Sequence, residues 1–293
     1  MQLTNIRNKE HPVRLWFGFA ARGLLIGLAD LFPGVSGGTM ALLTGVYVRF
    51  INSLASLRPA LFLFLRGRIR EAVQGVDWLF LTALGCGAGL SIVLLARLVK
   101  WLLEHYHTQL LCLFAGLVCY TAYSLARQVK PRSTTIALGI VGFACAFFLR
   151  ELTGWFSRGE DLPPPLFALG GALAICAMML PGISGSLLLL LLGMYKPVIG
   201  AIATLDIATL GLFAAGALTG LLLFAPLLRY SYHHFTQHTL AFLAGLTFGA
   251  IRETLPLHAR GDNLVTGLLF VLVGLALGKA IDHIARFNHA QTR

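Results

Sequence analysis

The sequence has few charged side chains, and this shortage decides its class. Charged residues make up 12% of the 293 positions, whereas an average soluble domain has about 25%. Hydrophobic residues make up 57%, and the mean hydropathy is +0.78. A water-soluble globular domain is therefore excluded. We expect an all-α integral membrane protein, because a helix satisfies its own backbone hydrogen bonds inside a bilayer.

Acidic residues are scarcer than basic ones. The chain has 12 Asp and Glu against 23 Lys and Arg, which gives a formal net charge of +11. The basic residues gather in connections between apolar runs, where they orient a membrane protein and meet anionic lipid. We therefore predict that these basic residues contact the membrane bilayer, and that the protein has no nucleic-acid partner.

Patterns that bind metals or form disulfides are also missing. The five cysteines lie in apolar segments without a CxxC pair, and His233, His234 and His238 have no cysteine or carboxylate close by in sequence. Zinc sites need such partners. We therefore predict unreactive buried thiols, no metal and no cofactor.

What the sequence does contain is a motif that occurs twice. Residues Pro33 to Thr39 read PGVSGGT, and Pro181 to Leu187 read PGISGSL, 148 residues later. A Gly-x-Tyr follows each copy at the same distance and ends at Tyr47 and Tyr195. Both copies interrupt apolar runs, so each is predicted to break a helix at membrane depth.

The predicted breaks are Pro33-Gly34 and Pro181-Gly182. Proline removes a backbone donor and glycine permits left-handed or close-approach geometry, so each pair ends one helix and turns the chain. Broken helices inside a membrane normally line a cavity, and paired breaks are typical of transporter binding sites. The alternative is that Pro-Gly only kinks two helices and Ser-Gly only lets them pack closely.

A new half-helix is expected to begin just after each turn. Its first amides lack acceptors and its dipole end is positive, which favours an anion such as phosphate. The glycines would leave these amides accessible, and the serines and threonine add hydroxyl donors. The predicted phosphate-binding residues are Ser36, Gly37, Gly38, Thr39, Ser184, Gly185 and Ser186, together with Arg22.

Other polar groups are candidates for the pathway or for energy coupling. Arg22 lies mid-segment, about two turns of helix before Asp30. A charge at that depth is costly and often functional, but an Arg22–Asp30 structural pair or a snorkelling side chain is an equal alternative. The candidates are Asp30, Tyr47, Tyr195, Arg252 and Glu253. No catalytic residue is predicted.

The chain is predicted to be two repeats, each a re-entrant hairpin followed by three transmembrane helices. The repeats cover residues 13–150 and 166–285, with tails at 1–12 and 286–293 and a loop at 151–165. The basic connections at 58–70 and 127–132 and both tails fall on the cytoplasmic side if each hairpin enters and leaves on one side. The 151–165 loop is then periplasmic, and the repeats are inverted.

The paired motifs resemble the two signature motifs of the PopT polyprenyl-phosphate transporters, long catalogued as a domain of unknown function. The resemblance runs from about Trp16 to Ile284. It implies a multi-pass protein of the bacterial cytoplasmic (inner) membrane with two opposed re-entrant hairpins. It also implies return of undecaprenyl phosphate from the outer to the inner leaflet, for peptidoglycan and other envelope polymers.

The two copies differ where the second half-helix follows the turn. Ser186 stands where the first copy has Gly38, and Leu187 stands where it has Thr39. The two half-sites are therefore expected to be unequal.

Two other functions remain open at this point. A secondary transporter of a small anion is one, because the motif suits phosphate without requiring a lipid. An integral-membrane lipid phosphatase is the weaker one. No histidine follows the Ser-Gly of either copy, and covalent phosphoryl chemistry needs a nucleophile with an oriented base.

Overall fold

A computed structural model of the chain describes residues 12–31, 36–149, 151, 163–254 and 264–291. These residues form helices and short connections, with no strand among them. The first half contains α1 (Pro12–Asp30), α2 (Gly37–Leu43), α3 (Tyr47–Leu65), α4 (Ile69–Gln74), α5 (Trp78–His105), α6 (His107–Ala126) and α7 (Ser133–Phe147). The second half contains α9 (Pro164–Met179), α10 (Gly185–Leu191), α11 (Tyr195–Thr204), α12 (Ile207–His234), α13 (Thr236–Thr254) and α14 (Leu264–Gln291).

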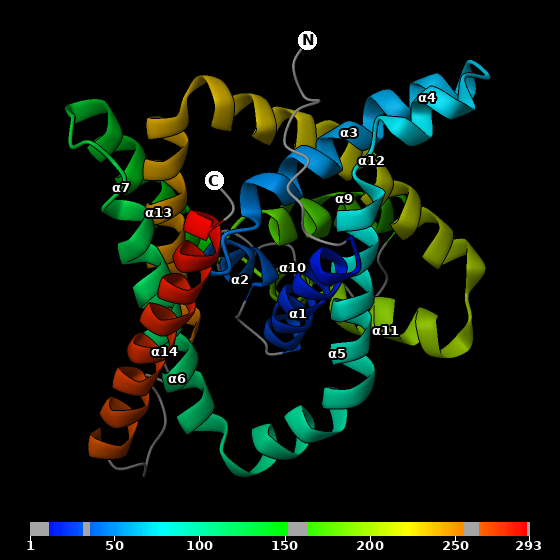
Figure 1. The fold of residues 1–293 in the computed structure, drawn as a ribbon. Coiled ribbons are helices and arrows are strands. Elements are labelled where there is room, and N and C mark those ends of the chain that lie inside the picture. Colours follow the sequence, from blue (N-terminus) through cyan, green and yellow to red (C-terminus); the bar gives the residue numbers. More distant parts are fainter. Residues whose placement is uncertain (1–11, 32–35, 150, 152–162, 255–263, 292–293) are drawn as a thin grey trace.

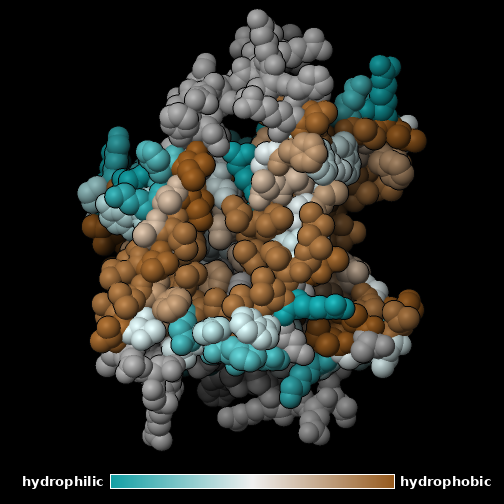
Figure 2. Space-filling model, turned by 60° about the horizontal axis from the view of Figure 1, so that its bottom comes forward, coloured by the Kyte–Doolittle hydropathy of each residue, from teal (hydrophilic) through white to brown (hydrophobic). Residues whose placement is uncertain are grey.

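Length and apolar composition identify the helices that can cross a membrane. Five helices in the described part of the chain qualify, namely α3, α5, α6, α12 and α14. A sixth span results if α10 and α11, which meet at a bend of 112°, count as one. Figure 2 shows a broad hydrophobic band with hydrophilic residues above and below it. This surface fits a multi-pass membrane protein.

An aspartate caps the N-terminus of the long helix in each half. Asp77 precedes α5 and accepts the Phe80 amide, and Asp206 precedes α12 and accepts the amides of Ala208 and Thr209. Each carboxylate satisfies donors that a helix start leaves unpaired. The two halves thus use the same device at the same place.

Helix α3 continues further than the sequence indicated. Residues 58–70 were expected to be a basic connection, but α3 runs through Pro59 to Leu65, and a short α4 follows. A proline inside a helix costs one hydrogen bond, and the apolar residues beyond it resume the helix. Gly67, with a φ of +75°, makes the turn after α3.

The hairpin helices pack closely on the long helices of their own half. Helix α1 lies on α5 and α9 lies on α12. A Cβ added to Gly87 would lie 2.0 Å from the Ala20 carbonyl oxygen, and one added to Gly216 would lie 1.8 Å from that of Ala168. Glycine at these positions therefore lets the helix backbones touch, as it commonly does in membranes.

The remaining helices pair between the halves. Helix α6 lies against α14, and α7 lies against α13, on one side of the molecule (Figure 1). The crossings again use glycine: Gly116 faces the Val271 carbonyl, and Gly245 faces that of Gly139. The short helices α2 and α10 lie at the centre, enclosed by the longer ones (Figure 1). The two halves therefore share one contact scheme, with α2 and α10 inside it.

Candidate functional site

The two helix breaks meet at the centre of the protein. Helix α1 ends at Asp30 and α2 begins at Gly37 after the capping residue Ser36, whereas α9 ends at Met179 and α10 begins at Gly185 after Ser184. The expectation that a half-helix begins at each motif serine is confirmed. Of the four predicted break residues, Pro33 and Gly34 lie outside the described residues, and Pro181 and Gly182 are buried.

Gly182 needs to be glycine for two reasons. Its φ is +91°, a region that side chains rarely adopt, and a Cβ would lie 2.7 Å from the Thr247 Cα on α13. The Thr247 hydroxyl donates to the Leu243 carbonyl at 2.7 Å and reaches the Pro181 carbonyl at 3.5 Å. The second break is thus held directly against the backbone of α13.

Side chains of the first copy satisfy backbone groups that the second break leaves unpaired. The Gly182 amide donates to Thr39 Oγ1 at 2.9 Å, and Ser36 Oγ donates to the Leu180 carbonyl at 3.2 Å. The Tyr47 hydroxyl donates to the Met179 carbonyl at 2.9 Å. Because a helix interrupted in hydrocarbon needs protein partners for its backbone, these three bonds join the two motifs.

The first amides of α2 already have acceptors. The Gly37 amide donates to Asp30 Oδ1 at 2.7 Å, and the Gly38 amide donates to Ser36 Oγ at 3.2 Å. Ser36, Gly37, Gly38 and Thr39 are all buried. The sequence suggested accessible amides here, but in this arrangement a carboxylate occupies the place that an external anion would take.

The second copy is arranged differently. The hydroxyls of Ser184 and Ser186 lie 2.9 Å apart, and the Ser184 side chain caps no amide among the described residues. Met178 takes the place of Asp30: a Cβ on Gly185 would lie 2.6 Å from Met178 Cγ, just as one on Gly37 would lie 2.5 Å from Asp30 Oδ2. A thioether offers no charge, so the first turns of α2 and α10 have different surroundings.

A small cavity lies beside the first half-helix. Its volume is about 160 Å³, and the Asp30 carboxylate is its one ionisable group among the described residues. The lining also includes Gly37 and Gly38 from the first copy and Met178 and Met179 from the second. The cavity therefore touches both motifs.

The other predicted polar residues differ from one another in their contacts. The Arg22 guanidinium donates to the Gly18 carbonyl at 3.3 Å and lies near the Phe19 ring; within the described part of the chain it forms no ion pair with Asp30. Tyr47 is 2% exposed, whereas Tyr195 is 39% exposed, so the matched tyrosines have different surroundings.

Arg252 is part of a contact between α13 and the segment after α7. Its guanidinium donates to both carboxylate oxygens of Glu151, at 2.7 and 3.1 Å, and to the Phe147 carbonyl. This bidentate pair suits a structural role at the edge of a loop. Glu253 belongs to α13, but its side chain lies outside the described residues.

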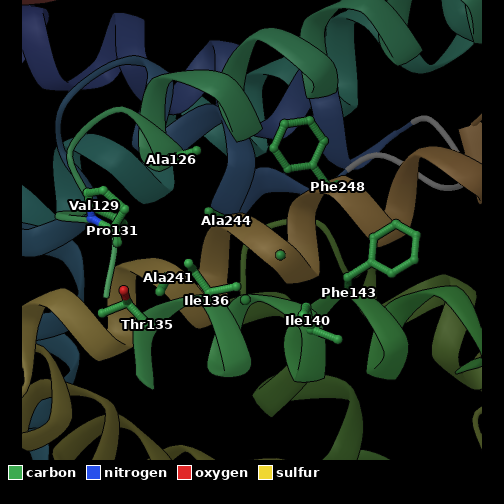
Figure 3. A pocket seen from close by; sticks show the side chains of 12 residues that line it. Ala126, Val129, Pro131, Thr135, Ile136, Ile140, Phe143, Ala241, Ala244 and Phe248 are labelled. Atoms are coloured by element: carbon green, nitrogen blue, oxygen red, sulfur yellow. The ribbon is translucent and has the colours of Figure 1, made fainter. Parts of the chain in front are cut away.

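An apolar groove opens between α7 and α13. Its volume is about 450 Å³, and Figure 3 shows Ile136, Ile140, Phe143 and Phe248 around it. Thr135 is the one hydroxyl residue in the lining that the structure describes. Residues on another face of α13, among them Thr247, contact the second break. The groove suits a hydrocarbon chain and offers no group that would hold a phosphate.

Sequence reasoning missed two residues of the junction. Thr247 lies far along the chain from either motif, and no local pattern marks it. Met178 could have been found, since it aligns with Asp30 at the 148-residue spacing of the motifs. The alignment alone would have shown that one copy has a carboxylate and the other has none.

Comparisons with known proteins agree on one family. Residues 26–267 match the family model described as undecaprenyl phosphate translocase-like. The chain is 36% identical over 238 residues to a polyprenyl-phosphate transporter of Vibrio cholerae, covering 80% of this chain and 76% of that protein. It is 29% identical over 279 residues to one of Staphylococcus aureus, covering 88% and 94% respectively. No solved structure matches significantly.

The bond between Thr39 and Gly182 makes a direct prediction. Thr39→Val keeps the side-chain shape but leaves the buried Gly182 amide without an acceptor. We expect a loss of about 1–2 kcal/mol of stability, measured as a lower melting temperature in detergent. The control is Thr219→Val, which removes an exposed hydroxyl that bonds only within its own helix. Equal melting temperatures for the two variants would contradict the role of Thr39.

Proposed function

Because the chain belongs to the undecaprenyl phosphate translocase-like family, we propose that it translocates a polyprenyl phosphate across the membrane. The observation that carries this conclusion is the family match over residues 26–267, which includes both helix breaks. The relatives named polyprenyl-phosphate transporters match in both halves of the chain. The substrate is a lipid of the undecaprenyl phosphate type.

The physical task of such a protein fits this architecture. The isoprenoid chain can stay in hydrocarbon while the charged head crosses, so the protein has to provide polar groups only for the head. Polar groups at the centre gather where the two breaks meet, whereas the face shown in Figure 2 carries a broad apolar band. The head is therefore expected to cross at the junction of the breaks.

The direction proposed is from the outer to the inner leaflet of the bacterial cytoplasmic membrane. Envelope polymers are assembled outside on this carrier, and the freed lipid phosphate has to return for reuse. Asp30 is proposed to take part in energy coupling, since its carboxylate lies at the junction and lines the cavity beside both motifs.

The two repeats are proposed to be inverted, with both termini cytoplasmic. The supporting observation is that basic connections from both halves lie together. The Lys130 amide in the 127–132 connection donates to the Gln237 side chain at the start of α13, and His233 at the end of α12 bonds Asn52 on α3. A shared basic face is typical of the cytoplasmic side.

Cysteine labelling tests the inversion. In a variant without native cysteines, Arg70→Cys on α4 should react with an impermeant maleimide only after the cells are permeabilised. Leu205→Cys, between α11 and α12, should react in intact spheroplasts, because the inverted arrangement places it on the periplasmic face. Both residues are exposed. Labelling of both from the same side would rule out inverted repeats.

The phosphate is proposed to bind at the junction, mainly to the second copy. Ser184 and Ser186 bond each other through hydroxyls that could turn to a ligand, and Gly185 lies between them. The first copy, with Ser36, Gly37, Gly38 and Thr39, is committed to internal bonds, so a phosphate could use its amides only if Asp30 moved away. Arg22 is proposed to assist by its charge.

Reconstitution gives the main test of function. Vesicles that contain the purified chain and a fluorescent polyprenyl phosphate are treated with an impermeant quencher, and the fraction of protected lipid is followed over time. The chain should exchange lipid phosphate between leaflets, whereas the matching polyprenol without phosphate should give no protein-dependent signal. A rate equal to that of protein-free vesicles would refute the proposal.

The role of the second copy is tested by removing its hydroxyls. Ser184→Ala/Ser186→Ala should lower the translocation rate at least about tenfold, since a hydrogen bond to a charged group contributes about 1.5 kcal/mol or more. The control Thr204→Ala/Thr219→Ala also removes two hydroxyls, both exposed and bonded within their own helices. The assignment fails if both double variants transport alike while remaining folded.

A further inference from the structure

A basic groove separates α3 from α12 at the end of the molecule that carries α4. Its volume is about 480 Å³, and its lining includes Arg58 from α3 and Arg229, Tyr230, His233 and His234 from α12. Among the described residues, no carboxylate lines it. The family motifs do not reach it, and the phosphate site proposed above does not use it.

The two arginines of the groove are available to a ligand. Both are exposed, and within the described part of the chain neither forms an ion pair or a side-chain hydrogen bond. Other arginines near this face are engaged: Arg49 pairs with Asp77, Arg68 with Glu71 and Arg127 with Asp282. Two unpaired guanidinium groups on facing helices suit the oxygen atoms of a phosphate.

The histidines and the tyrosine are held in place beside the arginines. His233 Nε2 lies 3.0 Å from Asn52 Oδ1 across the helix interface, and the His234 ring stacks on Tyr230 at 4.2 Å. His234 Nδ1 also lies 3.1 Å from the Tyr230 carbonyl. The aromatic part of the groove wall is thus fixed in position, beside two arginines that have no partner of their own within the described residues.

A proline in each helix helps to keep the groove open. Pro59 of α3 and Pro226 of α12 both line it. Proline inside a helix removes a backbone hydrogen bond and commonly kinks the axis. Two such residues facing one groove keep the helices from packing along their whole length.

Beyond the groove, α3 and α12 remain in contact toward the helix breaks. Arg229 and His233 line the groove and also belong to this tighter contact, which includes Asn52 and Tyr47 of α3. The Tyr47 hydroxyl bonds the Met179 carbonyl at the second break. One face of α3 therefore leads from the basic groove to the junction where the phosphate is proposed to bind.

We infer that this groove is a second binding site for a phosphate monoester, the head of the transported lipid, at one surface of the membrane. Arg58 and Arg229 bind the phosphate oxygens, and Tyr230, His233 and His234 form the wall beside them. The site holds the head before or after its passage through the junction. This inference rests on the proposed function for its ligand, while the groove itself rests on the geometry alone.

The test uses the full-length protein in nanodiscs of zwitterionic lipid. Calorimetric titrations with farnesyl phosphate, farnesol and inorganic phosphate are compared for the wild type, for Arg58→Gln/Arg229→Gln and for Arg70→Gln/Arg132→Gln. The last pair removes two exposed arginines outside the groove. Because the substituted arginines are exposed, size-exclusion profiles and melting temperatures should match the wild type.

We expect the groove variant to raise the dissociation constant for farnesyl phosphate at least tenfold, and the control pair to change it less than threefold. The same increase should occur in the Ser184→Ala/Ser186→Ala background, because the two sites are separate. A parallel loss of inorganic phosphate binding supports recognition of the phosphate alone. A loss confined to farnesyl phosphate supports a lipid head with its chain. Unchanged farnesyl phosphate binding overturns the inference.

Translocation separates the groove from the proposed function itself. If the groove only collects the head, its variant should raise the half-saturating lipid concentration about tenfold and leave the maximal rate unchanged. If the wild type does not translocate lipid, the proposed function is refuted. The titration with inorganic phosphate then still shows whether the groove binds phosphate. The groove assignment alone is refuted if the wild type translocates lipid but the groove and control variants have the same half-saturating concentration and the same dissociation constant.

Discussion

The backbone groups that two helix breaks release inside a membrane are the constraint on which this structure depends. No water is available in hydrocarbon to satisfy them, so the protein has to supply every partner. It does so across the repeat: Thr39 accepts from Gly182, Ser36 donates to Leu180, and Tyr47 donates to Met179. The breaks must therefore lie together, and the glycine-mediated crossings of the longer helices bring them there.

Because of these hydrogen bonds between the two motifs, the two copies have different roles. In the first copy, the hydroxyls and the Asp30 carboxylate all form hydrogen bonds within the protein, and the motif residues are buried. The second copy has Met178 in place of that carboxylate, and its serines bond only each other among the described residues. The two copies of one motif thus have different roles: the first holds the junction together, and the second keeps a less committed pair of hydroxyls.

Much of this could be predicted from the sequence, because Pro-Gly chemistry is local. The starts of α2 and α10, the all-helical class and the family follow from short patterns and from composition. The acceptor of the Gly37 amide, the contact of Gly182 with Thr247 and the burial of Tyr47 depend on residues brought together by the fold, which no local pattern marks. The basic connection expected from Arg58 onward was wrong, because the apolar residues after Pro59 continue α3 in spite of the lost hydrogen bond.

The pairing of helices between halves also governs how the chain can be made. Helices α6 and α7 make their largest contacts with α14 and α13, which leave the ribosome much later. During synthesis, the helix surfaces at Gly116 and Gly142 lie in the bilayer before the backbones of α14 and α13, which cover them in the finished protein, have been made. Assembly is therefore finished after translation of the last helix, and a chain that stops early leaves a half-protein whose close-packing surfaces remain open to lipid or to the wrong partner.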